Sequence, residues 1–390
     1  MTVTRWPELP GMADVSHNDS LAILGEAAIK TNAQVHQLSV MSLLPQLIPA
    51  PQALIRTSRP TELKPSIGKV IGSRSGGIRD FVQHIAHLLH SHDALEDYNV
   101  RCERITKPNL KANVSANRFG PLAINSAIGF AMSVALVTIS AIRGDGFGLL
   151  ATILLSLLST LIGIGSRWKL KLKKRSSTRD LPEDRIVVNY PNGSFRIIIC
   201  TEEVARELYW HPETCHYVFG DEIYRFICLI CTLTLMIGVV CLGNASLDLQ
   251  VAFGASYLIL NVAYWTVAAL PKQWHWDLSC YKVERIHYEG GEENKSFTTA
   301  LWKAIAITGN VEWVKNGRIA PVSAGWNRWV DEAGEAAWRG EEDVKKESTR
   351  SSESDGRSAE VHEVRPLPKW DPEKALDEAL KNPHSTNGAV

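Results

Sequence analysis

The chain contains four long apolar stretches without a charged side chain, and these stretches constrain its fold more than any other feature. They cover residues 121–142, 147–166, 226–243 and 249–270, with lengths of 22, 20, 18 and 22 residues. At about 1.5 Å of rise per residue, helices of these lengths reach roughly 27 to 33 Å, which matches a hydrocarbon core of about 30 Å. Each stretch is therefore predicted to cross a membrane as an α-helix.

Overall composition alone would suit a soluble protein. The 390 residues carry 42 basic and 42 acidic side chains, the pI is about 7.2 and the mean hydropathy is −0.08. The alternative fold is thus a large soluble core with four buried helices. Such helices usually stop after about 10 to 14 apolar residues or carry a polar stripe. We therefore expect a membrane protein.

The four stretches are expected to form two helical hairpins. Short turns, RGDG at 143–146 and NASLD at 244–248, separate the members of each pair. The hairpins then cover residues 121–166 and 226–270. Lys and Arg are retained on the cytoplasmic side of a membrane. Five of them lie within 101–118 and eight within 167–185, whereas the two turns contain one, Arg143. Both termini and the segment 167–224 are therefore predicted to be cytoplasmic.

The predicted fold class is a mainly α, polytopic membrane protein with four transmembrane helices arranged as two hairpins. A small cytoplasmic α/β insert lies between the hairpins, and amphipathic helices follow them. In domain terms, we expect a partly disordered cytoplasmic N-terminal region (1–118), the insert (167–224), a cytoplasmic helical region (271–339) and a disordered tail (340–390).

The insert contains the clearest β signal of the chain. IVVNYPNGSFRIIIC, residues 186–200, has two β-branched runs joined by Pro-Asn-Gly-Ser, in which Asn-Gly suits a tight hairpin turn. A helix is predicted from Glu202 to about Trp210, with Thr201 as its cap. The preceding RWKLKLKK alternates cations with Trp168, Leu170 and Leu172 and is compatible with a strand. A sheet of three strands with one helix is possible.

Further helices are predicted on both sides of the apolar stretches. One runs from about Gly77 to His92 and carries His84, His87 and His90. His84 and His87 could share a metal ion, but a partly exposed helix face is the favoured interpretation, because no carboxylate or cysteine completes a ligand set. After the last stretch, helices are expected within 296–338 and a short one at 371–380. Their tryptophans 326, 329 and 338 pack either on the protein itself or on the inner leaflet.

A block of cations follows the second apolar stretch. Its members are Arg167, Lys169, Lys171, Lys173, Lys174 and Arg175. A block at this place anchors the topology, and cations near an anionic leaflet each contribute about 1 kcal/mol of attraction. We therefore expect these six side chains to contact lipid headgroups on the inner leaflet.

Motifs for known chemistry are not found in the sequence. It lacks GxxxxGK[ST], HExxH, GxSxG and an EF-hand loop. No catalytic, metal or cofactor-binding residue is therefore predicted, and no nucleic-acid partner is expected. Within the apolar stretches the candidate polar positions are Asn125 and Asn261. Small residues repeat at helical spacing, as in Ser159 with Gly163 and Ala131 with Ala135, which favours close helix contacts.

Three long strings carry a family resemblance: GFGLLATILLSLLSTLIGIGSRWKLKLKKR, VVNYPNGSFRIIICTEEVARELYW and LNVAYWTVAALPKQWHWDLSCY. They resemble a family of uncharacterised multi-pass membrane proteins of filamentous fungi. The resemblance covers roughly residues 118–338. It implies a multi-pass membrane topology and no site residues, because the family has no assigned activity.

The leading functional hypothesis is a non-enzymatic, membrane-anchored binding or scaffold protein with its soluble module on the cytoplasmic face. Its partners would be the bilayer, including anionic inner-leaflet lipids, and a cytoplasmic protein or a second copy of the chain. The alternative is an oligomeric channel or facilitator for a small solute, with Asn125 and Asn261 on its path. A membrane enzyme is a third hypothesis, for which His211, His216 and His275 are the candidates.

Overall fold

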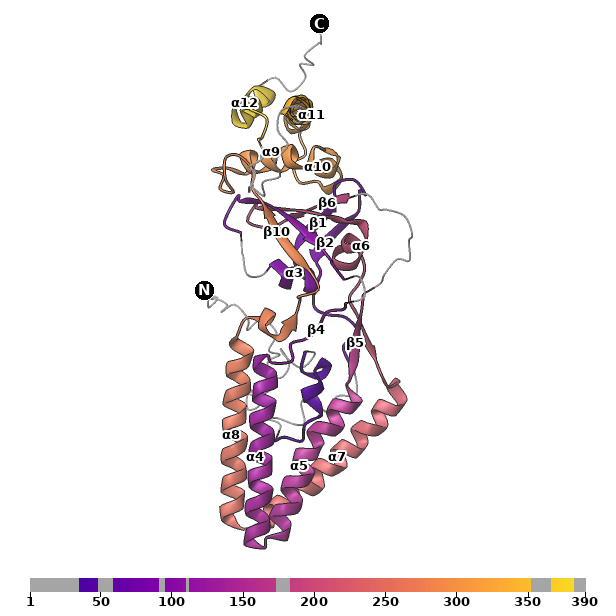
Figure 1. The fold of residues 1–390 in the computed structure, drawn as a ribbon, viewed down its shortest axis with the longest axis vertical. Helices are drawn as coiled ribbons and strands as arrows, with labels where there is room; N and C mark the ends of the chain where they lie inside the picture. The colour runs from indigo at the N-terminus through magenta and orange to yellow at the C-terminus, as the bar shows by residue number, and fades with distance from the viewer. Residues whose placement is uncertain are drawn as a thin grey trace, which may run out of the picture. The chain divides into compact units, whose positions relative to one another are not determined.

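The structure, a computed structural model, describes residues 35–47, 59–90, 95–109, 112–172, 183–351 and 366–381 (Figure 1). The chain divides into two compact units. The helical unit comprises Met1–Thr61, Val114–Lys171 and Cys215–Leu278, and the sheet unit comprises Glu62–Asn113, Leu172–Thr214 and Ser279–Val390. Each unit is thus assembled from three separate pieces of the sequence.

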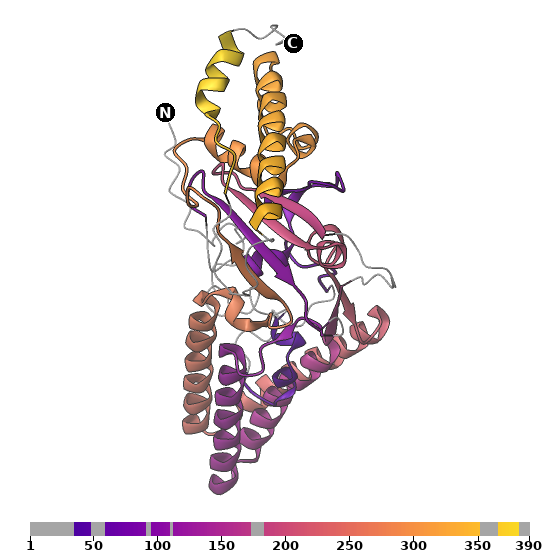
Figure 2. The ribbon, with the colours of Figure 1, turned by 45° about the horizontal axis from the view of Figure 1, so that its top comes forward.

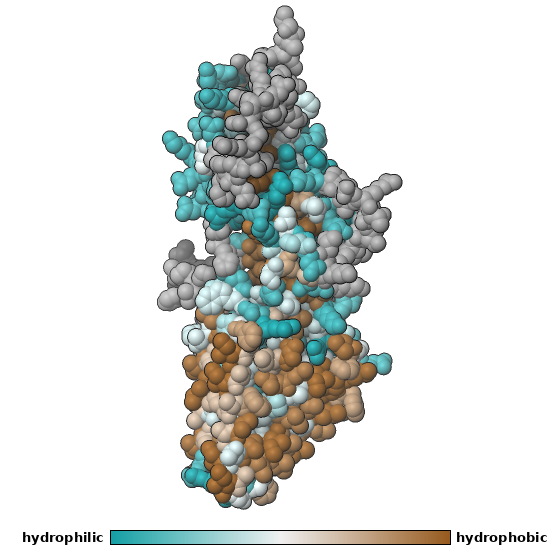
Figure 3. Space-filling view, viewed as in Figure 1, coloured by the Kyte–Doolittle hydropathy of each residue, from teal (hydrophilic) through white to brown (hydrophobic). Residues whose placement is uncertain are grey.

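Four helices of the helical unit are long and apolar enough to cross a membrane. They are α4 (Pro121–Arg143), α5 (Gly146–Gly165), α7 (Asp221–Gly243) and α8 (Leu247–Ala269), with 23, 20, 23 and 23 residues. Large apolar side chains are exposed along all four helices, and Figure 3 shows this hydrophobic surface in brown. The protein is therefore a membrane protein with four candidate spans, in agreement with the prediction.

Polar contacts join the turn between α4 and α5 to the turn between α7 and α8. Gly144 ends α4 at a φ of 67°, a left-handed conformation that favours glycine. Asp145 then caps α5 by accepting a hydrogen bond from the Gly148 N–H at 2.9 Å. Its second carboxylate oxygen accepts from the Ser246 N–H at 2.7 Å, and Arg143 pairs with Asp248. The turn after α4 and the turn after α7 therefore lie together.

Residues 35–47, which the sequence did not place among the spans, lie against α4 and α5. The segment contains the short helix η1 (Val40–Leu43). The Gln46 N–H donates to the Ser156 carbonyl and the Ser159 hydroxyl at 3.1 and 3.0 Å, and the Leu47 N–H donates to Ser133 Oγ at 3.1 Å. These positions are in the middle of both helices.

The hydroxyls of α5 also satisfy the carbonyls of this segment. Ser159 Oγ donates to the Leu44 carbonyl and Thr160 Oγ1 to the Leu43 carbonyl, each at 3.0 Å. Backbone carbonyls within a bilayer core need such partners from the protein, because water is absent there. The polar residues of α5 thus bind an irregular piece of backbone.

Small residues on α5 permit segment 35–47 to approach this helix closely, whereas the small residues singled out on α4 face outward. A Cβ on Gly163 would lie 2.4 Å from the Ser42 carbonyl oxygen, so only glycine fits. Ser159 and Gly163 therefore make the predicted close contact, although with segment 35–47. Ala131 and Ala135 are exposed on α4. The helix contact expected at that pair is absent among the described residues because those positions face outward.

Two short strand pairs flank the spans. β5 (Trp168–Lys171) pairs with β8 (Thr214–Tyr217), and β4 (Ser115–Ala116) pairs with β9 (Trp276–Asp277). The predicted alternation is present in β5, where Trp168 and Leu170 are buried and Lys169 is exposed. The Trp168 and Trp276 rings meet edge to face with centroids 6.5 Å apart.

The sheet unit is built on a six-stranded sheet with the order β10-β3-β7-β6-β1-β2. β3 and β7 are parallel neighbours, and the remaining neighbours are antiparallel. The strands are β1 (Ser66–Gly72), β2 (Ile78–Val82), β3 (Val100–Thr106), β6 (Glu183–Asn189), β7 (Phe195–Thr201) and β10 (Lys282–Ile286).

This sheet corrects the prediction of a separate insert at 167–224. The predicted hairpin is present as β6 and β7, but its neighbours come from residues 66–106 and 282–286. The reason lies in its apolar runs, Ile186–Val188 and Ile197–Ile199, in which consecutive side chains are buried. Strands that are apolar on both faces need cover on both faces, so β6 and β7 occupy the centre of a larger sheet.

Helices cover both faces of the sheet. On one face, α9 (Phe297–Thr308) and α10 (Glu312–Gly317) pack on the side chains of Phe195, Ile197 and Ile71, and α11 (Ala324–Ser351) and α12 (Pro372–Lys381) complete this core. Figures 1 and 2 show α11 and α12 as an outer layer over α9. The other face receives α3 (His84–His90), α6 (Glu202–Ala205) and the π-helix Arg206–Trp210.

The hairpin turn uses the residues that the sequence singled out. The Gly193 N–H donates to the Tyr190 carbonyl and the Tyr190 N–H donates to the Ser194 carbonyl, at 3.0 and 3.1 Å. Gly193 alone in this turn has a positive φ, 74°. The connection is thus a turn closed by one left-handed glycine, a geometry typical of a three-residue hairpin loop.

Other boundaries differ from the prediction. The helix expected over Gly77–His92 is instead the strand β2 followed by α3, because Ile78–Val82 pairs with β1. The region 271–339 contains the strand β10 as well as helices, and the N-terminal region contributes three strands to the sheet. In the predicted disordered tail, α11 continues to Ser351 and α12 forms at the expected position. The remaining tail residues, 352–365 and 382–390, lie outside the described residues.

The close contact at Gly163 generates a stability prediction. Gly163→Ala should force the Ser42 carbonyl away from α5, at a cost of about 1 to 3 kcal/mol for overpacking. Gly254→Ala in α8 is the matched control, because a Cβ there meets no atom within 4 Å. Thermal unfolding of the full chain in detergent should show a lower melting temperature for Gly163→Ala only. Equal melting temperatures for both variants would contradict the described contact.

Candidate functional site

The predicted cation block is only partly described by the structure. Arg167 is half-buried and Lys169 is exposed on β5. The backbone of Lys171 ends β5, whereas Lys173, Lys174 and Arg175 lie outside the described residues. The expected contact of these cations with lipid headgroups therefore stays a prediction.

The two polar candidates within the spans are not brought together by a shared contact. Asn125 is buried in the second turn of α4, and its amide atoms have no hydrogen-bond partner among the described residues. Asn261 in α8 is half-buried and donates to the Tyr257 carbonyl of its own helix at 3.1 Å. Neither residue lines the two pockets described below.

The candidate histidines occupy separate surroundings. His211 belongs to the sheet unit, whereas His216 and His275 belong to the helical unit. On α3, His84 contacts the Lys64 carbonyl, and His90 points into the sheet unit. Within the described part of the chain, no group of three or more His, Cys, Asp or Glu is arranged to hold a metal ion.

A chain of buried polar contacts crosses the sheet unit on the face covered by α3. Arg196 of β7 donates to one carboxylate oxygen of Glu103 on β3, and the other oxygen lies 3.0 Å from His90 Nδ1. His90 Nε2 lies 2.8 Å from the hydroxyl of Tyr209 on the π-helix. The Glu103 and Arg196 side chains are 3% and 2% exposed, which leaves them out of reach of a dissolved substrate.

The pKa shifts describe the charge states of the groups in this chain of contacts. Burial lowers the pKa of His90 and raises that of Tyr209, so His90 is neutral and Tyr209 keeps its proton. Burial would raise the pKa of Glu103, but hydrogen bonding to His90 and the charge of Arg196 outweigh it and lower the pKa to about 2. Neutral His90 and neutral Tyr209 therefore share a hydrogen bond, and Arg196 donates to an ionised Glu103.

A second buried pair lies beside the first. Lys107 Nζ contacts Glu207 Oε1 at 2.5 Å, with side chains 1% and 5% exposed, and it lies 5.2 Å from the centre of the Tyr281 ring. Glu207 comes from the same π-helix as Tyr209. Paired charges of this kind fix which strands and helices meet, because each would be costly to bury alone. We therefore assign both clusters a structural role, namely to stabilise the fold.

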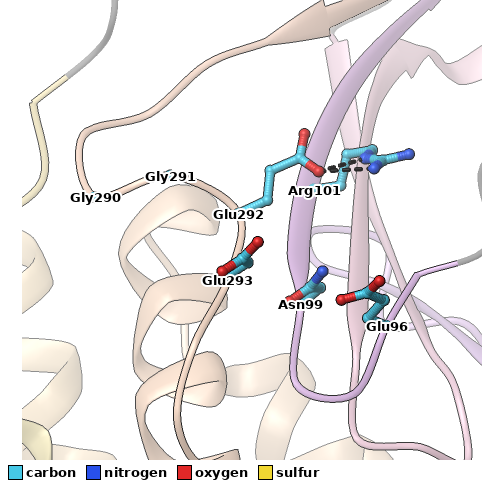
Figure 4. A pocket seen from close by; sticks show the side chains of 7 residues that line it. All are labelled: Glu96, Asn99, Arg101, Gly290, Gly291, Glu292 and Glu293. Atoms are coloured by element: carbon cyan, nitrogen blue, oxygen red, sulfur yellow. Dashed lines mark hydrogen bonds and ion pairs between the residues drawn. The ribbon is translucent and has the colours of Figure 1, made fainter.

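An open pocket, which we call the acidic pocket, forms where the loop before β3 meets the loop after β10 (Figure 4). Its volume is about 580 Å³. It is lined by Glu96, Asn99, Arg101, Gly290, Gly291, Glu292 and Glu293. Figure 4 shows the Glu293 and Glu96 side chains on either side of Asn99.

Hydrogen bonds hold the two loops of the acidic pocket together. The Val100 N–H donates to the Glu292 carbonyl at 2.9 Å, and Asn294 Nδ2 donates to the Tyr98 carbonyl at 3.0 Å. Tyr98 has a φ of 59°, a conformation that is uncommon outside glycine and marks a tightly specified loop. Gly290 and Gly291 also have positive φ values, 82° and 67°.

The charges in the acidic pocket are unequally matched. Arg101 pairs with Glu292 at 2.7 Å, so this arginine and this glutamate neutralise one another. Glu96 and Glu293 take part in no ion pair among the described residues. Asn99 is 8% exposed, and its amide makes no hydrogen bond to another described residue. The pocket therefore presents two carboxylates without a counter-charge among the described residues, and one buried amide.

A second pocket, the tryptophan pocket, shares Gly290 and Glu293 with the first and has a volume of about 520 Å³. Trp302 and Trp370 line it with their ring centroids 4.6 Å apart. Its other lining residues are Glu289, Asn294, Lys295, Thr299, Lys303, Leu367, Asp371, Pro372 and Glu373. The two pockets are thus adjoining parts of one recess around Gly290.

Several polar groups of the tryptophan pocket already have partners. Lys303 Nζ donates to the carbonyls of Gly290 and Gly291, and burial lowers its pKa. Glu373 accepts from the hydroxyls of Ser296 and Thr299 at 2.7 and 3.3 Å. Glu289, like Glu293, has no ion-pair partner among the described residues.

This recess was not predicted from the sequence, because its walls come from residues 96–101, 289–303 and 367–373. One local signal was available: Glu-Gly-Gly-Glu-Glu at 289–293 combines acidic residues with the conformational freedom of two glycines. The recess is the candidate functional site, because its polar groups are accessible and those of the buried chain of contacts are not.

The buried chain of contacts generates a prediction for the fold. Glu103→Gln leaves Arg196 buried without its counter-charge, which should cost about 3 to 5 kcal/mol of unfolding free energy. Glu284→Gln removes an exposed partner of Lys282 and should leave the unfolding transition unchanged. Chemical unfolding of both full-length variants checks this expectation. A Glu103→Gln protein as stable as the control would show that the buried pair does not hold the fold.

Comparison with known proteins finds no relative of this chain. No family model matches the chain, and neither the curated proteins nor the solved structures contain a match. The resemblance to fungal multi-pass membrane proteins thus stays an expectation from the sequence. The geometry of the two units is what bears on function.

Proposed function

We propose that this chain is a non-enzymatic, membrane-anchored binding protein whose sheet unit is the binding module. The four apolar helices, threaded as two hairpins, anchor it, and the recess around Gly290 receives the partner. The observation that carries the proposal is the meeting of two open pockets, about 580 and 520 Å³, at Gly290 and Glu293. Recesses of this size are typical of sites for small molecules or peptide side chains.

The distribution of Lys and Arg supports a cytoplasmic location for the sheet unit. Lys and Arg are concentrated before the first span and after the second, and Arg143 alone lies in the short turns. In this proposal both termini and the sheet unit face the cytoplasm. The exposed Lys169 and the rest of the cation block then lie near the inner leaflet, where anionic lipid attracts them.

A facilitator receives less support than a binding protein. A transport path needs polar groups that face a continuous opening. Asn261 instead bonds to its own helix, and the hydroxyls of Ser133, Ser159 and Thr160 bind segment 35–47. These contacts use four of the polar groups that a path would need, whereas the buried amide of Asn125 makes no hydrogen bond to another described residue.

A capture experiment tests the proposal. The tagged full chain would be purified with its partners from the cells that express it, and the captured proteins quantified. Glu293→Arg changes an exposed residue shared by both pockets and should reduce capture of a specific partner at least tenfold. Glu378→Arg, exposed on α12 and outside both pockets, is the matched control and should retain capture. Identical captured sets for all three proteins would count against the recess as the binding site.

A further inference from the structure

We propose that the recess around Gly290 binds a basic peptide, with one Lys or Arg side chain in each pocket. This inference rests on the proposed function and adds the chemical class of the partner. Its starting point is the number of carboxylates without a counter-charge. Glu96, Glu289 and Glu293 line the recess, and none of them forms an ion pair with another described residue.

The acidic pocket contributes a site for a cationic hydrogen-bond donor. Glu96 and Glu293 lie on either side of Asn99, whose amide is more than nine-tenths buried and without a partner among the described residues (Figure 4). A carbonyl oxygen of this amide and two carboxylates together accept several N–H groups. An ammonium or guanidinium group, which has three or five N–H donors and no acceptor, supplies such groups.

The tryptophan pocket contributes an apolar surface beside further negative charge. Trp302, Trp370 and Leu367 form its apolar part, and Glu289 and Asp371 lie on the same lining. Lys and Arg combine a hydrocarbon stem with a charged end, so the stem can pack on the rings while the end meets a carboxylate. Cations over a tryptophan face also gain attraction from the ring.

The connection between the pockets favours a peptide over a single small cation. Gly290 and Glu293 line both pockets, so a ligand in one pocket continues directly into the other. A metal ion is disfavoured, since no metal-binding group of His, Cys, Asp or Glu occurs among the described residues. Anions are disfavoured because Arg101 and Lys303 are already engaged by Glu292 and by backbone carbonyls. The third cation of the lining, the exposed Lys295, is outnumbered by the carboxylates that line the recess.

Direct binding of labelled peptides tests this inference. The full chain would be placed in nanodiscs of phosphatidylcholine, which has no net charge and does not attract basic peptides. Fluorescein-labelled nonapeptides alternating Ser with Lys, Gln or Glu would then be titrated and followed by fluorescence polarisation. We expect binding of the Lys peptide, weakened by added salt, and at least tenfold weaker binding of the Gln and Glu peptides.

Two variants of the recess and one control variant locate the bound peptide. The double variant Glu289→Gln with Glu293→Gln should weaken binding of the Lys peptide at least tenfold. The double variant Asp377→Asn with Glu378→Gln, at exposed positions of α12, should leave the affinity for this peptide unchanged. Trp370→Leu should weaken binding of the Lys peptide roughly two- to fivefold, as expected for loss of a cation–π contact. A melting curve of each variant confirms that the protein is folded.

The outcomes separate this inference from the proposed function. If the Gln or Glu peptide binds as tightly and the double variant abolishes that binding, the recess is a binding site but the basic class is wrong. Equal binding of the Lys peptide to all variants, or no binding at all, overturns the inference. Displacement of the Lys peptide by equimolar spermidine also overturns it in favour of a small polyamine. The capture experiment with Glu293→Arg tests the proposed function separately.

Discussion

The absence of water from a bilayer core is the constraint on which the structure depends. Every backbone N–H and C=O placed there needs a partner within the protein. The four apolar helices satisfy this need internally, whereas segment 35–47 obtains partners from Ser133, Ser159 and Thr160. The hydroxyls of these three residues are thereby explained without a pore. The same constraint leaves the sheet unit, with its many charges, as the part suited to water.

Within the sheet unit, similar side chains perform different tasks according to their exposure. Glu103 is buried and its charge is matched by Arg196, so it belongs to the contacts that fix the fold. Glu293 is exposed, lacks an ion-pair partner among the described residues and lines both pockets. Removing the first should therefore affect stability, and changing the second should affect recognition. This division separates the scaffold of the unit from its proposed site.

Local patterns in the sequence predict the elements that local forces determine. The four spans, the 186–200 hairpin, the helical turns at 202–210 and the helix at 371–380 are all present. Pairing between distant segments was not predicted: Ile78–Val82 has a helix-compatible pattern, but its pairing with β1 makes it a strand. Segment 35–47 is too short and irregular to resemble a span. The recess was missed because three distant stretches of chain form it.

In the proposed topology, four helices cross a membrane and the sheet unit lies on the cytoplasmic side. Glycosylation mapping in microsomes tests it most directly. A long loop with an acceptor sequon would be inserted in the turn at Gly144, or appended after Val390. We expect the acceptor at Gly144 to be modified and the acceptor after Val390 to remain unmodified. Modification of the appended acceptor, or of neither, would contradict the proposed threading.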